Sequence, residues 1–348
     1  MSERATALAP GQPLPPWQRA TAAAALQARA RWPQALLITG RRGIGKGILA
    51  LHFAQALLCE HPNPDGSACG ACPSCGYVLA GAHPDLRLIE LFEADEEGNP
   101  TPVDRIEVDR IRQLTEFTQL SSHRQRAKVA LIAPAEGMNT AAANALLKTL
   151  EEPPPATYLI LVSHLPGGLP ATIVSRCQRL LAPEPDAAAA SAWLEAQGAP
   201  NASLLLAQAG GAPLLALTFA DAAVQREREL LLDALARPER LRPVLLGARL
   251  EAFPKEERKV QLAAVVYWLQ TWIADLAASS SGGTPRFNPD RRDVLRRLGQ
   301  KVARLKLFRY YGTLLQQRAL LGHPLQPRLV VEALLFEYLA LFGTGDVH

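Results

Sequence analysis

Short runs of apolar residues alternate with longer amphipathic segments in the first half of the chain. A continuous apolar run of about five residues is typical of a strand that is buried on both faces of a parallel sheet. The runs are Ala35 to Thr39, Leu86 to Phe92, Val129 to Ala133 and Tyr158 to Ser163, with Gln178 to Leu181 as a further candidate.

Segments with helical periodicity separate these runs. They span residues 20–30, 48–58, 105–120 and 140–150, and the third carries apolar residues at Ile106, Ile111, Leu114 and Phe117. Strands that alternate with helices predict an α/β fold built on a doubly wound parallel sheet. Pro183, Glu184 and Pro185 mark its end.

No convincing strand pattern follows residue 186. Short helices are expected at 186–197, 202–209 and 213–219, and longer amphipathic helices begin after residue 221. The Ser/Gly-rich segment 279–285 interrupts them and is expected to be mobile. We therefore predict a flexible tail (1–16), an α/β domain (17–182), a small helical domain (183–222) and a larger helical domain (223–348).

Composition agrees with this picture. Hydrophobic residues make up 48% of the 348 residues and charged residues 20%, as in ordinary globular proteins. The net charge of +4 permits contact with an anionic polymer without requiring it. We found no apolar run of about 18 residues and no apolar segment typical of a signal peptide, so a cytoplasmic protein without a membrane span is expected.

The first apolar run leads directly into a glycine-rich loop, Gly40-Arg41-Arg42-Gly43-Ile44-Gly45-Lys46-Gly47. It fits the start of a phosphate-binding loop, in which backbone N–H groups and the lysine hold phosphates. The next position normally supplies a Ser or Thr hydroxyl to Mg²⁺, and here it is Gly47. The residues that would hold phosphate are therefore present, but the Ser or Thr ligand to Mg²⁺ is missing.

The second element that would organise Mg²⁺ is also missing. ATPases of this type carry an Asp at the end of another strand, usually followed by a Glu. Here the apolar run ends in Ala133 and Pro134, and Glu136 is interpreted as a surface or capping residue. We expect neither hydrolysis nor a bound ATP with Mg²⁺. Whether Lys46 still contacts a phosphate or is a surface lysine stays open.

Four of the five cysteines form a cluster with the spacing C-x9-C-x2-C-x2-C: Cys59, Cys69, Cys72 and Cys75. Four thiolates with two short spacings suit tetrahedral Zn²⁺ without an open position, which is typical of a structural site. Clustering of this kind indicates a metal site in a reducing compartment. An iron–sulfur cluster and unliganded thiols are the alternatives. Zinc is favoured because all four residues fall within one insertion, residues 59–76.

Two further motifs carry a family resemblance: Asn144-Ala145-Leu146-Leu147-Lys148-Thr149-Leu150-Glu151-Glu152-Pro153-Pro154, and Ser175-Arg176-Cys177. Together with the cysteines, they resemble the delta-prime subunits of bacterial DNA polymerase III clamp loaders. Pro16-Trp17, His83-Pro84-Asp85 and Val108-Asp109-Arg110-Ile111-Arg112 add to the resemblance, which extends over residues 16–220.

The resemblance implies an AAA+ core, a small helical lid and a helical collar. It implies a subunit that shares a five-subunit ring with ATP-hydrolysing motor subunits and the delta subunit, and that does not hydrolyse ATP itself. Arg176, flanked by Ser175 and Cys177, would reach the ATP of the adjacent motor subunit, where an arginine stabilises developing charge. An ion pair with Glu151 or Glu152 is the alternative for Arg176.

The lid supports the same interpretation. Active relatives carry an arginine in a G-x-x-R pattern that touches their own nucleotide, and here Pro213 stands in that place. The residues that would serve the chain's own nucleotide are thus missing at Gly47, Ala133 and Pro213.

Basic residues gather in the last third, on a helical stretch. They are Arg291, Arg292, Arg296, Arg297, Lys301, Arg304, Lys306 and Arg309. A solvated basic face is favoured over phosphate contact with DNA. Trp268 and Trp272 share a helix face and are interpreted as core or subunit-interface residues.

The favoured hypothesis is a non-hydrolysing clamp-loader subunit of the DNA polymerase III holoenzyme, a nucleotidyltransferase assembly. It would help to load the sliding clamp on primed DNA, which this chain would touch indirectly or weakly. An autonomous P-loop ATPase acting on DNA is the second hypothesis, which Gly47, Ala133 and Pro213 disfavour. A zinc-dependent nucleic-acid adaptor is the third, and it leaves Ser175-Arg176-Cys177 unexplained.

Overall fold

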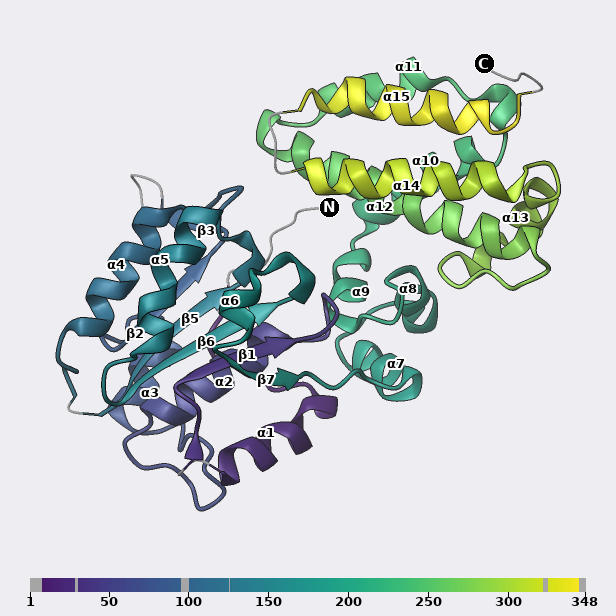
Figure 1. Cartoon of the computed structure of the whole chain (residues 1–348). Coiled ribbons are helices and arrows are strands. Elements are labelled where there is room, and N and C mark those ends of the chain that lie inside the picture. The colour runs from purple at the N-terminus through teal and green to yellow at the C-terminus, as the bar shows by residue number, and fades with distance from the viewer. Residues whose placement is uncertain (1–7, 29–30, 95–99, 125, 322–324, 344–348) are drawn as a thin grey trace. The chain divides into compact units, whose positions relative to one another are not determined.

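The computed structural model describes residues 8–28, 31–94, 100–124, 126–321 and 325–343. The chain divides into two compact units, one through Ala189 and the other from Ala190 onward. In the part of the chain that is described, the first unit holds every strand and the second consists of helices (Figure 1).

Five strands of the first unit form one sheet in the order β2-β5-β6-β1-β7. All neighbouring pairs in this sheet are parallel. The predicted doubly wound α/β fold is therefore confirmed, the candidate strand before Pro183 included. The strands are β1 (Ala35–Thr39), β2 (Leu86–Glu90), β5 (Lys128–Ala133), β6 (Thr157–Ser163) and β7 (Gln178–Leu181).

Helices cover both faces of this sheet, because its central strands are apolar on both sides. Leu36 and Ile38 of β1 share a hydrophobic cluster with α1 and α2. Ala35 and Leu37 share another with α4, α5 and α6, so alternate residues of one strand face opposite helical layers. The helices of this unit are α1 (Arg19–Gln27), α2 (Lys46–Leu58), α3 (Pro73–Leu79), α4 (Val108–Gln119), α5 (Thr140–Glu151) and α6 (Ala171–Val174), with 3-10 turns η1 (Pro16–Gln18), η3 (Ala135–Gly137) and η4 (Pro166–Gly168).

The strand predicted from Leu86 to Phe92 is in fact two strands. β2 ends at Glu90, and β3 (Phe92–Ala94) pairs antiparallel with β4 (Pro100–Pro102), a hairpin that the sequence pattern did not reveal. The guanidinium of Arg110 explains the break, since it donates to the carbonyl oxygens of Glu90 and Phe92 on either side of it.

Among the described residues of the second unit, every regular element is a helix. α7, α8 and α9 share one hydrophobic cluster, and α10, α12, α13, α14 and α15 contribute to a larger one. Trp268 and Trp272 are buried in the larger cluster, which confirms them as core residues. The helices are α7 (Ala187–Ala196), α8 (Ala202–Gln208), α9 (Pro213–Phe219), α10 (Ala222–Leu235), α11 (Pro243–Ala248), α12 (Lys255–Ser280), α13 (Arg292–Gly299), α14 (Arg304–Leu320) and α15 (Pro327–Ala340), with 3-10 turns η5 (Pro238–Arg240), η6 (Arg249–Ala252) and η7 (Pro289–Arg291).

The segment 279–285, predicted as a mobile loop, begins inside a helix, because α12 continues to Ser280. The chain beyond it is fixed by the buried carboxylate of Asp275. That carboxylate accepts hydrogen bonds from the backbone N–H groups of Arg286, Phe287 and Asn288 and from the Asn288 side chain. Each of these donors would otherwise need water or another acceptor.

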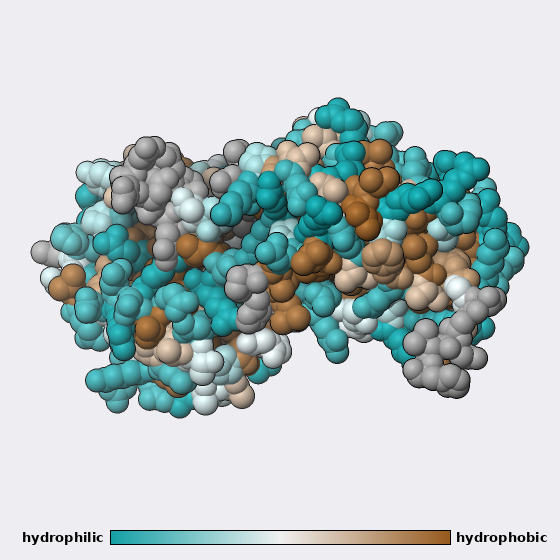
Figure 2. Space-filling model, turned by 90° about the horizontal axis from the view of Figure 1, so that it is seen from above, coloured by the Kyte–Doolittle hydropathy of each residue, from teal (hydrophilic) through white to brown (hydrophobic). Residues whose placement is uncertain are grey.

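One part of α12, Glu257–Ser280, is long and apolar enough to cross a membrane, and 67% of its apolar window is buried inside the structure. Core helices of soluble proteins pass the same test, and Trp272, Ile273 and Leu276 on this helix belong to the larger hydrophobic cluster. On the face drawn in Figure 2, hydrophilic residues surround smaller hydrophobic patches.

Replacement of Asp275 by alanine tests the loop anchor. The free energy of unfolding should fall by about 3 kcal/mol, because several buried donors lose a charged acceptor. Urea unfolding followed by tryptophan fluorescence, to which the buried Trp268 and Trp272 contribute, measures it. Asp293→Ala, on the exposed start of α13, should cost less than about 1 kcal/mol. Equal costs for the two variants would mean that Asp275 does not anchor the loop.

Candidate functional site

The glycine-rich loop connects the end of β1 to the start of α2. Gly40, Gly43 and Gly45 have φ angles of 145°, 79° and 93°, a region that glycine adopts without strain. α2 begins at Lys46, so its first backbone N–H groups border the loop. The strand, loop and helix of a phosphate-binding loop are all present.

Lys46 is buried, with 2% of its surface exposed, so the interpretation as a surface lysine is wrong. Its Nζ donates to the carbonyl oxygen of Arg41 within the same loop. Burial lowers the pKa of Lys46 to about 8, Glu136 opposes this shift, and Arg42 adds to it. The ammonium group is therefore held inside the loop by the loop's own backbone.

A side chain at Gly47 would need the Leu8 side chain to move. A Cβ atom at this position would lie 2.1 Å from Cδ2 of Leu8. Leu8 is fixed there because its backbone N–H donates to the Glu90 carboxylate at 2.8 Å and its side chain packs on the cluster that contains α2. The space beside the position of the missing Ser or Thr is thus filled by the chain's own N-terminal segment.

The N-terminal segment lies on the core from residue 8 onward. Leu14 packs against the same cluster as Leu8, and Pro15 would contact any Cβ at Gly45, at 3.0 Å. In the predicted flexible tail, Leu8, Leu14 and Pro15 therefore contact the core, whereas residues 1–7 lie outside the described residues.

No carboxylate stands at the end of β5, where Ala133 is the last residue. Glu136 follows in η3, and its Oε1 accepts the backbone N–H of His164 at 2.8 Å. Its Oε2 is buried and has no hydrogen-bond partner among the described residues. Glu136 therefore joins the ends of β5 and β6, a role that its interpretation as a surface or capping residue missed.

His164 was not singled out from the sequence. It directly follows β6, the strand next to β1, so parallel pairing brings it to the loop. Burial lowers its pKa to about 3, and the positive charges of Lys46 and Arg42 add to this effect, so His164 is neutral at pH 7. The signal that could have identified it is its place after a buried strand, where ligand-facing residues of parallel sheets occur.

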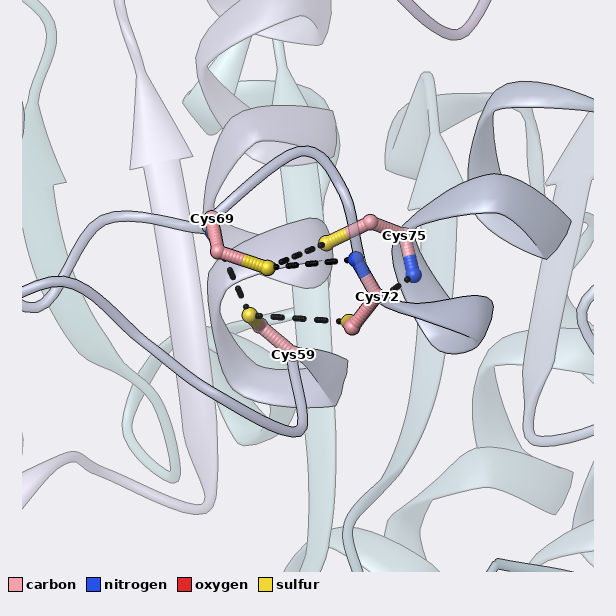
Figure 3. A group of neighbouring side chains, drawn as sticks. All are labelled: Cys59, Cys69, Cys72 and Cys75. Atoms are coloured by element: carbon pink, nitrogen blue, oxygen red, sulfur yellow. Dashed lines mark hydrogen bonds between the residues drawn. The ribbon is translucent and has the colours of Figure 1, made fainter.

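The four clustered cysteines converge on one point (Figure 3). Their Sγ atoms all lie within 4.8 Å of one another, and the pairs Cys59–Cys72 and Cys69–Cys75 are 3.9 and 4.0 Å apart. A tetrahedron of thiolates around Zn²⁺ with bonds of about 2.3 Å has edges of about 3.8 Å. The observed spacing is compatible with a four-coordinate structural metal. Backbone N–H groups of Cys69, Cys72 and Cys75 also donate to cluster sulfurs.

A hydrogen-bond chain fastens this insertion to the core. The Ser74 hydroxyl donates to the Leu58 carbonyl at 2.8 Å, so His83 must donate from Nε2 to Ser74 Oγ. His83 Nδ1 then accepts the backbone N–H of Asp85 at 3.0 Å. This gives His83-Pro84-Asp85 a structural role beside the cysteines, and burial lowers the pKa of His83 in agreement with a neutral ring.

Arg176 lies just after α6 and before β7. Its Nε donates to Oε1 of Glu151 at 2.7 Å, its Nη2 pairs with the same oxygen, and its Nη1 donates to the Thr172 carbonyl at 2.9 Å. The side chain is 33% exposed. Cys177 is buried in the hydrophobic cluster and anchors the motif, while the Ser175 hydroxyl also donates to Thr172. The ion pair with Glu151, the alternative interpretation of Arg176, is thus present, and the guanidinium is partly exposed.

The comparisons with known proteins decide the family. The sequence profile described as "DNA polymerase III, delta subunit" matches residues 20–185. The DNA polymerase III subunit delta' of Pseudomonas aeruginosa is 36% identical over 345 residues, which cover 95% of this chain and 98% of that relative. The chain belongs to the delta' family of DNA polymerase III subunits. The predicted resemblance to the delta' family is confirmed.

Two further similarities were found outside the delta' family. The tau subunit of DNA polymerase III from Bacillus subtilis is 36% identical over 149 residues, 43% of this chain and 24% of that subunit. A crystal structure of a gamma subunit-related protein from Thermotoga maritima aligns with 92% of this chain and 99% of its own, with 15% identity and a TM-score of 0.44.

The predicted basic stretch after residue 290 is divided in this delta' family member. α13 ends at Gly299 and α14 begins at Arg304. Arg291 is paired with Glu229, Asp233 and Asp290, so it is not free for DNA. The other basic residues of the stretch are exposed, as the favoured interpretation of a solvated face requires: Arg292, Arg296, Arg297, Lys301, Arg304, Lys306 and Arg309.

A double-mutant cycle tests the packing of Leu8 on Gly47. Gly47→Thr should lower the free energy of unfolding by about 1–3 kcal/mol, because its side chain meets Leu8. Leu8→Ala should remove this clash, so the two effects should differ from additivity by about 1 kcal/mol or more. Chemical denaturation of the four proteins measures the cycle, and additive costs would show that the two residues do not touch.

Proposed function

We propose that this chain is the non-hydrolysing delta' subunit of a clamp loader and that Arg176 acts as an arginine finger. In this proposal the subunit shares a five-subunit ring with ATP-hydrolysing motor subunits and the delta subunit. Arg176 contacts the ATP of an adjacent motor subunit, so that the ring loads the sliding clamp on primed DNA. Any contact of this chain with DNA is indirect or weak. The complex works in the cytoplasm.

The observation that carries this proposal is the place of Arg176 in the sheet. Parallel register pairs Gln178, the first residue of β7, with Leu36 near the start of β1. The glycine-rich loop begins only after Thr39, the last residue of β1. The level of Gln178 and the end of β1 are therefore three residues of strand apart, on the order of 10 Å. Arg176 comes before β7, so it lies at the opposite end of the strands from the glycine-rich loop. This separation from the chain's own loop supports the proposal that Arg176 serves another subunit's nucleotide.

The chain's own loop supports the absence of hydrolysis. Gly47 lacks a hydroxyl for Mg²⁺, and Leu8 occupies the space beside it. Ala133 lacks the carboxylate that would hold Mg²⁺ through water. Pro213 is the first residue of α9, so the lid position for a nucleotide-sensing arginine carries no charge. These features disfavour the alternative of an autonomous P-loop ATPase.

The physical value of an arginine supplied in trans is large. Negative charge spreads over the transferred γ-phosphoryl group in the transition state, and an arginine finger contributes about 10³–10⁵ in rate in other nucleotide hydrolases. A guanidinium suits this task because it stays charged and offers paired donors.

The proposal also assigns a role to each domain. Residues 17–182 form the core, residues 183–222 form the lid, and residues 223–348 form the collar that joins neighbouring subunits.

We also propose that the four clustered cysteines hold one structural Zn²⁺. Their tetrahedral spacing fits the ion, and the four thiolates leave no open position for chemistry. The metal would stabilise the insertion 59–76, whose α3 is already fastened to α2 through Ser74.

The purified protein should contain about one zinc per chain, measured by elemental mass spectrometry. Cys72→Ser should lose the metal and lower the melting temperature, because four-coordinate sites contribute to folding. Cys177→Ala is the matched control: its thiol lies outside the cluster, so its metal content should be unchanged. Stoichiometric iron with visible absorbance, or no metal at all, would contradict the assignment.

Replacement of Arg176 by alanine tests the finger. In a complex reconstituted with the motor and delta subunits, hydrolysis of the ATP that Arg176 contacts should fall on the order of 10³-fold or more, seen as the loss of that site's share of the DNA- and clamp-stimulated ATPase. Clamp loading should fall with it, while assembly measured by size-exclusion chromatography stays intact. Arg179→Ala is the control, since Arg179 is also exposed and lies on the adjacent β7.

Unchanged ATPase in the Arg176→Ala complex would refute the finger. ATP hydrolysis by the isolated chain that disappears in a Lys46→Ala variant would instead support the alternative of an autonomous ATPase.

A further inference from the structure

The guanidinium of Arg176 is held on two of its sides. Of its five N–H donors, Nε–H and one N–H of Nη2 are directed to Oε1 of Glu151. One N–H of Nη1 is directed to the carbonyl oxygen of Thr172, four residues earlier. The planar group therefore has a defined orientation although it lies at the surface.

Two donors remain after these contacts, one on each terminal nitrogen, as far as the described residues show. A pair of N–H groups on Nη1 and Nη2 is the arrangement with which arginine binds two oxygens of one phosphate. The side chain is 33% exposed, so an incoming anionic group can reach this pair.

Glu151 is carried by a rigid part of the fold. It is the last residue of α5, whose first turn is capped by the Asn139 side chain, which accepts the N–H of Ala142 at 2.7 Å. Leu146 and Leu150 of the same helix are buried in the core. The carboxylate that holds Arg176 is therefore attached to a helix that is fixed at both ends.

Stability alone explains this pair poorly. The Glu151 side chain is 49% exposed, and ion pairs at this exposure contribute only about 0–1 kcal/mol. A negative charge at the carboxyl end of a helix is also unfavourable with respect to the helix dipole. The orientation of the guanidinium is what the pair clearly provides.

We propose that Glu151 is a positioning residue that aims the free N–H pair of Arg176 at a phosphate of the neighbouring subunit's nucleotide. The inference rests on the proposed function of Arg176 and adds to it the group that sets its geometry. Glu151 does not touch the nucleotide and transfers no proton.

The test uses the full complex reconstituted with motor and delta subunits, with ATP as the probe. Glu151→Ala should lower kcat for the ATP that Arg176 contacts about tenfold, with little change in KM for ATP, because ground-state binding is provided by the motor subunit. Glu151→Gln should recover most of the rate, since its amide oxygen can still accept the Nε–H of Arg176. The double variant with Arg176→Ala should be no slower than Arg176→Ala alone, as residues that act as one unit are not additive.

Glu152→Ala is the matched control. Glu152 is the next residue, is exposed and makes no contact with Arg176 in the described structure, so its complex should hydrolyse ATP at the normal rate. Size-exclusion chromatography and thermal melting of each variant show that folding and assembly are intact.

The outcomes separate the two proposals. If Arg176→Ala lowers the rate and Glu151→Ala does not, the positioning role is refuted and the finger stands. A faster Glu151→Ala complex also refutes it, because Glu151 would then restrain the arginine. If Arg176→Ala leaves the rate unchanged, the arginine-finger proposal is refuted, and the positioning role of Glu151 is refuted as well.

Discussion

The parallel pairing of all neighbouring strands in the five-stranded sheet is the constraint on which the rest of the α/β unit depends. Because the strands run in the same direction, residues that follow a strand lie at the carboxyl end of the sheet. Residues that precede a strand lie at its amino end. Lys46, Glu136 and His164 come together because each lies soon after a strand. Glu151 and Arg176 meet because each lies shortly before one. One topological rule thus produces two separate groups of charged residues.

The positively charged side chains of the two groups, Lys46 and Arg176, lie in opposite environments. Lys46 is desolvated, its pKa is lowered by burial, and its ammonium is turned to a backbone carbonyl inside its own loop. Arg176 keeps solvent contact and is aligned by a carboxylate. A buried lysine bonded to its own backbone suits a loop kept for its shape, whereas an exposed and aligned guanidinium suits an encounter with another molecule.

Much of the fold could be predicted because its signals are local. Apolar runs located the strands, glycine spacing located the loop, and cysteine spacing located the four-cysteine cluster. Contacts between distant segments could not be predicted in this way. Nothing in the sequence around Gly47 indicates that Leu8 lies against it, and the choice of Glu151 over Glu152 as the partner of Arg176 depends on where α5 ends. The β3–β4 hairpin was missed for the same reason, because the Arg110 side chain that ends β2 comes from another element.

The packing of Leu8 on Gly47 has a consequence for substitutions at both positions. A single mutation that restored Ser or Thr at this position would place new atoms where Leu8 already sits. It would also leave Ala133 without a carboxylate for the metal ion. A hydroxyl-bearing side chain at position 47 therefore requires the Leu8 side chain to move. Position 47 and the N-terminal segment are thus coupled, so a substitution at one of them limits which side chains the other can hold.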